Sequence, residues 1–307
     1  MLSHPVDFLK SVYDHNIEDS LILDWLEATC MFLEDELSRT DVVDHLVQEQ
    51  IFETQDSASE FVLSTWSNLE KRLSWLGSYT PIVFDGRQMF RQLDWRDVPV
   101  HSYCLVVSLG ARYDDWHATF GPNYIEQGSL FESITEAAMK LRFQGWKFLQ
   151  TGWSRGNTSK LTAVIDGLIS TIDEREGKPD DYLDQEAKDA GVDLIWHLPF
   201  ANAQGGKPIY LAQCASGKNW IEKVNEPNIN EWTKIIDFAV PPSKAFSLPF
   251  SLSERELRRQ SNRAGGLMVD RYRLLAQNTA ESDWVPCTLR RELTNWLTPR
   301  IEWLRSK

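Results

Sequence analysis

Residues 188–220 read KDAGVDLIWHLPFANAQGGKPIYLAQCASGKNW and hold the two apolar runs that decide the fold. These runs, 192–197 and 209–214, are short and rich in branched and aromatic side chains, which is typical of buried β-strands. The segment between them contains Gly205-Gly206, and paired glycines favour a turn. Two such runs joined by a turn predict a β-hairpin.

Two polar side chains interrupt the predicted hairpin, Asp193 and Gln213. Successive side chains of a strand point to opposite faces, so Asp193 lies opposite Leu194, while Gln213 shares its face with Leu211. Paired strands lie about 5 Å apart, and a carboxylate and an amide oxygen can therefore converge at the strand ends. Hard oxygen ligands of this kind suit Mg²⁺. The alternative is structural, with Asp193 bonded to the backbone and Gln213 a satisfied buried amide.

The rest of the chain predicts an α/β (α+β) fold, in which a core sheet is flanked by helices and extended by helices at both ends. Apolar residues three and four positions apart predict helices, and branched or aromatic runs predict strands. The expected elements are helices within 1–78, a strand at 102–109, helices at 130–143 and 230–236, an extended segment at 238–250, and helices from 253 to 307. We expect three parts: an acidic, mostly helical region 1–100, a core 101–250 and a helical region 251–307.

Three Ser-x-x-Glu sequences predict capping boxes at helix starts, at 67–70, 129–132 and 253–256. In a capping box the serine and glutamate side chains bond backbone N–H groups that have no partner within the helix. A capping box at 129–132 gives Glu132 a purely structural interpretation.

The net charge of −13 is confined to one end of the chain. Residues 1–60 contain 15 acidic and two basic residues, and the remainder holds equal numbers of each. An acidic end repels phosphate, so a nucleic-acid-binding surface is expected elsewhere. The acidic end is either a solvated helical surface or a docking surface for a partner protein.

The sequence predicts a cytoplasmic protein without a membrane partner. No apolar run approaches the roughly 20 residues needed to cross a bilayer, and the N-terminus lacks the basic start and apolar stretch of a signal peptide. The four cysteines and six histidines are dispersed, so the sequence contains no zinc-binding pattern.

Short motifs resemble those of the PD-(D/E)XK (restriction-endonuclease-like) nuclease superfamily, in particular its Mrr-type branch. Gly191-Val192-Asp193 resembles the first strand motif of that branch, and Ala212-Gln213-Cys214 resembles the second. Phe131-Glu132 is similar to an upstream Phe-Glu that opens a helix. Residues 213–220 and 270–274 further resemble an uncharacterised subgroup associated with prokaryotic defence.

The resemblance covers residues 100–275 and implies a metal-dependent nuclease site. The implied residues are Asp193, Gln213 and Lys218 for catalysis and Asp193, Gln213 and Glu132 for binding Mg²⁺ or Mn²⁺. The superfamily lysine stands two positions after Gln213, where this chain has Ala215. Lys218 is the expected substitute, because a long side chain can reach back, and Lys223 is the next choice. The metal would activate water, and the lysine would orient that water or share the developing charge.

An arginine-rich segment near the C-terminus predicts contacts to phosphate. The candidate nucleic-acid-binding residues are Arg258, Arg259, Arg263 and Arg271. Arginine side chains often donate hydrogen bonds to phosphate oxygens. The alternative is a solvated helix with salt bridges.

The resemblance implies hydrolysis of phosphodiester bonds, in DNA, within a prokaryotic defence system. A nuclease of this kind needs a partner protein or a trigger that restrains it, and the acidic region is the candidate docking surface. One alternative is a catalytically decayed module that keeps the fold for nucleic-acid binding or complex assembly. A second is an all-helical structural protein in which the hairpin motifs arise by chance.

Overall fold

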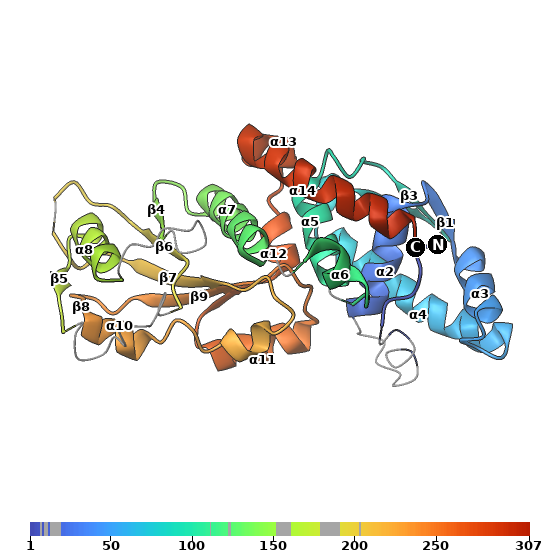
Figure 1. The fold of residues 1–307 in the computed structure, drawn as a ribbon, viewed down its shortest axis with the longest axis horizontal. Coiled ribbons are helices and arrows are strands. Elements are labelled where there is room, and N and C mark those ends of the chain that lie inside the picture. The colour runs from blue at the N-terminus through green and yellow to red at the C-terminus, as the bar shows by residue number, and fades with distance from the viewer. Residues whose placement is uncertain are drawn as a thin grey trace. The chain divides into compact units, whose positions relative to one another are not determined.

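The computed structural model describes residues 1–6, 8, 12, 20–110, 112–121, 124–151, 161–178, 191–202 and 204–307. The chain forms two compact units (Figure 1). Unit 1 comprises Met1–Pro122, Pro249–Ser253 and Arg271–Lys307, and unit 2 comprises Asn123–Leu248 and Glu254–Asp270. Both ends of the chain therefore belong to unit 1.

Unit 1 is mostly helical and carries one small antiparallel sheet. Its helices are α2 (Ser20–Phe32), α3 (Arg39–Gln48), α4 (Gln55–Ser74), η1 (Gly77–Tyr79), α5 (Pro99–Gly110), α6 (Trp116–Phe120), α12 (Arg271–Leu275), α13 (Glu281–Trp284) and α14 (Cys287–Arg305). Its strands β1 (Glu36–Ser38), β2 (Ile82–Asp85) and β3 (Gln88–Arg91) lie in the order β1-β3-β2. Helices α2 and α14 pack against α5.

The strand predicted at 102–109 is wrong, because this segment forms most of α5. Every residue of α5 is buried, and a helix that is covered on all sides has no polar stripe to reveal its period. Its Leu-Val-Val run then has the composition of a strand. The expected boundary after residue 100 falls inside α5, which belongs to unit 1.

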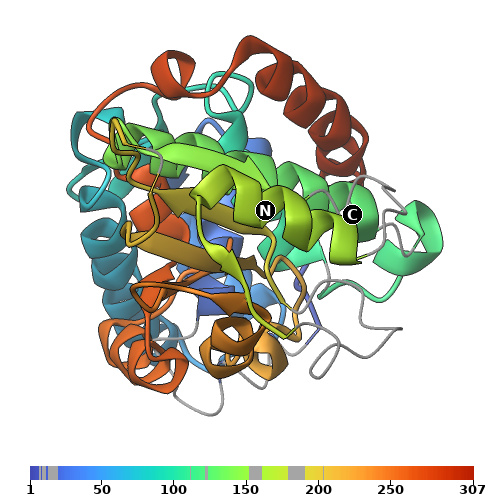
Figure 2. The same ribbon diagram turned by 90° about the vertical axis from the view of Figure 1, so that its left-hand side faces the viewer.

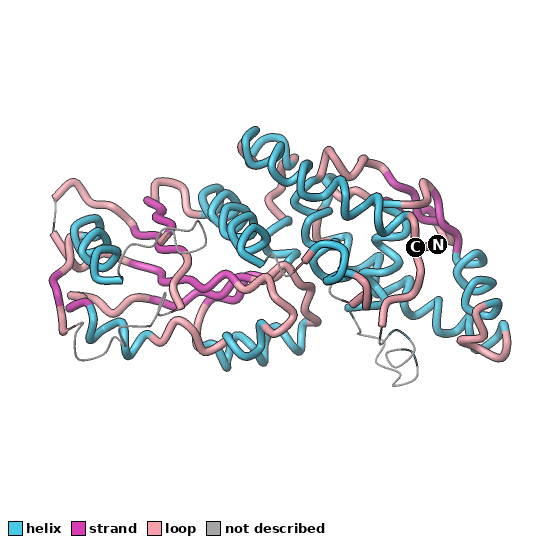
Figure 3. The backbone as a smooth tube through the Cα atoms, viewed as in Figure 1, coloured by secondary structure: helices cyan, strands magenta, loops and turns pink. Residues whose placement is uncertain are grey.

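Unit 2 is built on a five-stranded mixed sheet with the order β10-β9-β7-β6-β4. Its strands are β4 (Lys147–Gln150), β6 (Leu194–His197), β7 (Ile209–Cys214), β9 (Ser243–Ser247) and β10 (Leu267–Val269). The pairs β4–β6 and β6–β7 are antiparallel, and the pairs β7–β9 and β9–β10 are parallel. A separate pair joins β5 (Arg175–Glu176) to β8 (Ile236–Asp237). The strands appear in magenta in Figure 3.

Helices cover both faces of this sheet, as Figures 1 and 2 show. They are α7 (Tyr124–Arg142), α8 (Leu161–Ile172), η3 (Trp220–Lys223), α10 (Ile229–Ile235) and α11 (Glu254–Ala264). Ile195 and Leu211 pack with residues of α8 and α10. On the opposite face Trp196 stacks on Tyr210 at 5.3 Å, and Phe143, just after α7, contacts both rings.

The predicted hairpin and the α/β fold with helices on both sides of a sheet are confirmed. Strand β6 pairs with β7 in the register Leu194↔Ala212 and Ile195↔Leu211. The five-stranded sheet excludes the all-helical alternative. Among the helices of the described residues, none is long and apolar enough to cross a membrane.

Two of the three predicted capping boxes are wrong. The sequence at 67–70 lies inside α4, whose N-cap is Thr54, and the sequence at 129–132 lies inside α7, which begins at Tyr124. Ser and Glu are also tolerated on helix surfaces, so a four-residue pattern cannot by itself locate a helix start. The third sequence coincides with the start of α11. Glu132 is therefore a mid-helix residue, and capping does not account for it.

Candidate functional site

A pocket of about 670 Å³ lies at the carboxyl end of β7 in unit 2. Four residues singled out in the sequence line it: Glu132, Asp193, Gln213 and Lys218. Glu132 lies in α7, and Asp193 directly precedes β6. Gln213 lies near the end of β7, and Lys218 lies in the loop that follows β7. The tertiary structure therefore brings the expected acids, amide and lysine to one cavity.

Asp193 turns its carboxylate toward the end of the neighbouring strand. Its backbone N–H donates to the Ala212 carbonyl at 2.8 Å, which continues the β6–β7 pairing by one residue. Its Oδ2 accepts from Gln213 Nε2 at 2.5 Å and from the Cys214 backbone N–H at 2.7 Å. The residue is only 7% exposed. These two donors hold the carboxylate beside the end of β7, where Asp193 lines the pocket.

The expected contact between Asp193 and Gln213 forms, but through the amide nitrogen. Gln213 is buried and donates to Asp193. The sequence interpretation had both oxygens facing a shared cation. A half-turn of the amide exchanges its oxygen and nitrogen, so the same side chain can serve as donor or as ligand.

Glu132 approaches the same strand end from α7. It is buried at 6% exposure. Burial raises the pKa of the Cys214 thiol well above its usual range, and the negative charges of Asp193 and Glu132 raise it further. Both carboxylates therefore act on one buried thiol, which places them around Cys214 at the end of β7. Cys214 lines the pocket and was not among the residues singled out.

Lys218 and Lys223 are exposed and line the pocket from the loop after β7. Ala215, at the expected lysine position, is buried, and its backbone N–H donates to the Ser247 carbonyl at 2.9 Å. That contact extends the β7–β9 pairing, so position 215 belongs to the packed sheet. The lysines reach the pocket from its rim instead.

A buried lysine that sequence reasoning missed holds this loop region to the sheet. Lys244, in β9, donates from Nζ to the Val224 carbonyl at 3.0 Å. Burial lowers its pKa to about 8, while Glu226 acts in the opposite direction. Val224 directly follows η3, so Lys244 fixes the end of the segment that carries Lys223.

Gly191 has a steric reason to be glycine. Its φ is +71°, and a Cβ there would lie 2.7 Å from the Glu226 Cβ. A side chain would meet both the left-handed backbone and this contact. Gly191 thus allows the left-handed backbone conformation two residues before Asp193.

The expected nucleic-acid-binding arginines divide into two groups. Arg258, Arg259 and Arg263 are exposed on α11, and Arg259 lies 3.5 Å from Glu256. Arg271 is fully buried in unit 1, where its Nη1 and Nη2 donate to Asp24 at 2.7 and 2.9 Å. The expectation that Arg271 contacts phosphate is therefore wrong, because its guanidinium is occupied inside the protein.

Arg271 belongs to a buried charge cluster, formed by Asp24, Glu27, Arg72, His101 and Arg271. Arg72 bonds both acids and lies 2.5 Å from Glu27 Oε2. Burial alone would raise the pKa of both carboxyls, but the arginines, together with His101 beside Glu27, hold both well below their usual range. The interruption of an apolar run by Asp24 and Glu27 was the available signal.

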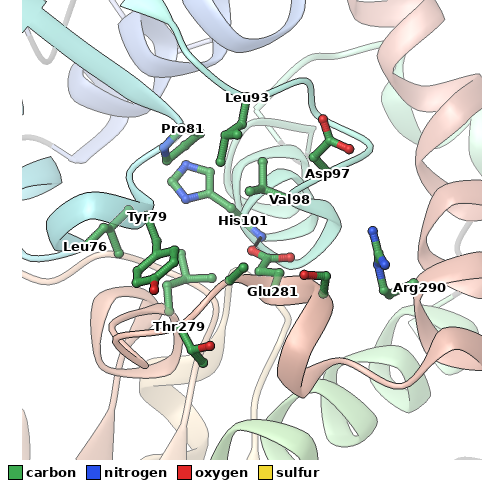
Figure 4. A pocket seen from close by; sticks show the side chains of 13 residues that line it. Leu76, Tyr79, Pro81, Leu93, Asp97, Val98, His101, Thr279, Glu281 and Arg290 are labelled. Carbon is green, nitrogen blue, oxygen red and sulfur yellow. Dashed lines mark hydrogen bonds between the residues drawn. The ribbon is translucent and has the colours of Figure 1, made fainter.

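A second pocket, of about 210 Å³, adjoins this cluster (Figure 4). Glu281 accepts from the backbone N–H groups of Val100 and His101 at 2.7 and 2.9 Å. Its carboxyl group therefore caps the first turn of α5. This contact holds α13 against α5, and the ion pair between Glu27 and His101 holds α2 against α5.

Comparison of the chain with protein-family models, with curated proteins and with the solved structures gives no match. Over the residues that the structure describes, there is no group of three or more His, Cys, Asp or Glu side chains arranged for a metal ion. A cation in the unit 2 pocket would depend on two carboxylates, an amide and water.

Proposed function

We propose that the chain is a divalent-metal-dependent nuclease whose site is the unit 2 pocket. The observation that supports this proposal is the convergence of Glu132, Asp193, Gln213 and Lys218 on one cavity. Residues 81 positions apart along the chain, from Glu132 to Gln213, meet there together with a lysine. The motifs that resemble the PD-(D/E)XK superfamily supply Glu132, Asp193 and Gln213, and Lys218 is the expected substitute for the superfamily lysine.

The donor set fits a hard cation. Carboxylate and amide oxygens are the ligands that Mg²⁺ takes, together with water and substrate phosphate. Asp193 and Glu132 would hold the ion, with Gln213 as a third ligand after its amide turns. A bound Mg²⁺ or Mn²⁺ would supply charge that activates water and polarises the phosphate.

Side chains and a backbone N–H group of the protein would perform the other steps. Gln213 and the Cys214 N–H orient Asp193. Lys218 would place its ammonium beside the phosphate and offset the charge that develops there. A water oxygen would bond to phosphorus as the bond to the leaving oxygen breaks, and the leaving oxygen would take up a proton.

Cleavage of labelled DNA in Mg²⁺ or Mn²⁺ tests the proposal. We expect Asp193→Asn to lower the rate at least about 100-fold, because it removes a metal ligand, and Lys218→Ala to lower it less. Asp237→Asn and Lys178→Ala are matched controls, since both residues are exposed in unit 2 outside the pocket. Equal activity of Asp193→Asn and wild type would refute the proposal.

A decayed module for nucleic-acid binding or assembly is the second candidate. Two observations favour it: Ala215 replaces the expected lysine, and Gln213 donates to Asp193. DNA binding without cleavage in either metal, with and without a cognate partner, would support this candidate over the enzyme.

The proposed biology is a cytoplasmic defence enzyme that acts on DNA and is restrained by a partner protein or a trigger. The acidic region remains the proposed docking surface, but only its solvent-exposed acids can contact a partner. Asp24 and Glu27 are buried. Among the acids that the structure describes in the first 60 residues, seven are solvent-exposed: Asp35, Glu36, Asp41, Glu49, Glu53, Asp56 and Glu60.

A further inference from the structure

The acids of the unit 2 pocket lie below the protein surface. Glu132, Asp193 and Gln213 are 6%, 7% and 4% exposed, although all three line a cavity of about 670 Å³. This volume is within the range of roughly 300–1,000 Å³ found for small-molecule sites. A phosphate must therefore enter the cavity to reach the carboxylates.

The rim of the same pocket is apolar on the α7 side. Tyr124 and Ile125 form the first turn of α7 and are 51% and 69% exposed. An exposed aromatic ring at a pocket entrance offers a flat surface on which an unstacked base can stack, and an aliphatic side chain beside it adds apolar contact. In a duplex the base faces are already covered by neighbouring bases.

The rim carries positive charge from another segment. Lys218 and Lys223 are exposed in the loop and in η3 after β7, and both line the pocket. Lysine side chains bind phosphate as point charges without selecting a base. An apolar rim with lysines and recessed acids thus combines contacts for a base, a flanking phosphate and a metal-bound phosphate.

We propose that this pocket takes an unstacked nucleotide of a single strand, with its base on Tyr124 and Ile125 and its flanking phosphates on Lys218 and Lys223. The inference rests on the proposed function, because the recessed acids would then face the scissile phosphate. A flexible single strand can bend a phosphate into the cavity. A stacked duplex holds its phosphates on a rigid helix and keeps them outside.

Binding and cleavage are measured on one fluorescein-labelled DNA strand, alone and annealed to its complement. Binding is followed by fluorescence anisotropy in EDTA and in Ca²⁺, and cleavage is followed in Mg²⁺ and Mn²⁺. We expect the single strand to bind and to be cut at least about ten-fold better than the duplex. Tyr124→Ala should weaken single-strand binding about ten-fold, and Tyr124→Phe should restore it.

The matched control is Phe200→Ala, because Phe200 is 54% exposed in the same unit and does not line the pocket. It should bind the strand as wild type does. Equal cutting of both DNA forms, or binding unchanged in Tyr124→Ala, would overturn the single-strand inference and leave the nuclease proposal intact. Single-strand binding through Tyr124 without cleavage would support the inference and refute the enzyme. Absence of both binding and cleavage would overturn both.

Discussion

The two units each gather carboxylates in a protected place, but they surround them differently. In unit 1, Asp24 is bonded by the guanidinium groups of Arg72 and Arg271, and all three residues are buried. In unit 2, Asp193 is bonded by an amide and a backbone N–H and faces a pocket. The charge of Asp24 is thus offset by arginines in the interior of unit 1, whereas Asp193 lines a cavity that a ligand could enter.

The arginines of the two units differ in the same way. Arg271 stabilises the carboxylate of Asp24, and its Nε also donates to the Pro249 carbonyl at 2.9 Å. The arginines of α11 remain exposed. Arg271 thus helps to hold the interior of unit 1 together, while the arginines of α11 are available at the surface of unit 2.

The largest expected effect distinguishes the two aspartates by an identical substitution. Asp24→Asn removes a buried negative charge that offsets Arg72 and Arg271, and should lower the free energy of unfolding by about 3–5 kcal/mol. Asp193→Asn keeps an oxygen acceptor for the Cys214 N–H and should change it by less than about 1 kcal/mol. Urea unfolding measures both. A cost at Asp193 equal to that at Asp24 would remove the proposed difference between the units.

A smaller effect is expected from divalent metal. Mg²⁺ or Mn²⁺ at about 100 times its dissociation constant should raise the free energy of unfolding by about 2.7 kcal/mol, because only the folded state holds the site. Asp193→Asn should lose most of this gain, whereas Asp237→Asn should keep it. Thermal unfolding with and without EDTA provides the measurement. An identical gain in wild type and Asp193→Asn would place the metal elsewhere.

The smallest expected effect tests the cap on α5. Burial raises the pKa of Glu281 to about 8, against the opposing effect of the Val100 and His101 N–H groups. The folded state therefore holds a proton that the unfolded state has released between about pH 4.5 and pH 8. This contribution to stability is complete below about pH 4.5 and is lost as the pH rises through about 8.

Glu281→Gln cannot titrate and removes that pH dependence. Relative to the variant, wild type should lose about 2 kcal/mol of stability between about pH 6 and pH 7.5, at about 1.4 kcal/mol per pH unit. Urea unfolding of both proteins at several pH values gives the difference directly. Parallel pH profiles would show that Glu281 titrates at its ordinary pKa.

The hairpin and half of the candidate site could be predicted because they are local. Asp193 and Gln213 lie on adjacent strands of one hairpin, so strand alternation and a short turn were enough to bring them together. Lys218 follows within a few residues. The Asp193–Gln213 contact confirms that geometry, although the amide presents its nitrogen.

Other residues could not be placed because long-range packing decides their surroundings. Arg271 and Asp24 are 247 positions apart, and no local pattern distinguishes an arginine paired across that distance from an exposed one. The burial of α5 likewise removed the periodicity that identifies a helix. Lys244 bonds the Val224 carbonyl and Tyr124 lines the pocket only because β9 and α7 pack against β7.

The sequence by itself determined the hairpin, the excess of negative charge near the N-terminus and the residue types able to bind a cation. Each of these follows from composition or from neighbours along the chain. Only the tertiary structure decided that Glu132 lines the same pocket as Cys214, that Arg271 is buried, and that Tyr124 and Ile125 line a pocket together with two lysines. Those outcomes depend on which elements bury their surfaces against one another, and burial is a property of the whole fold.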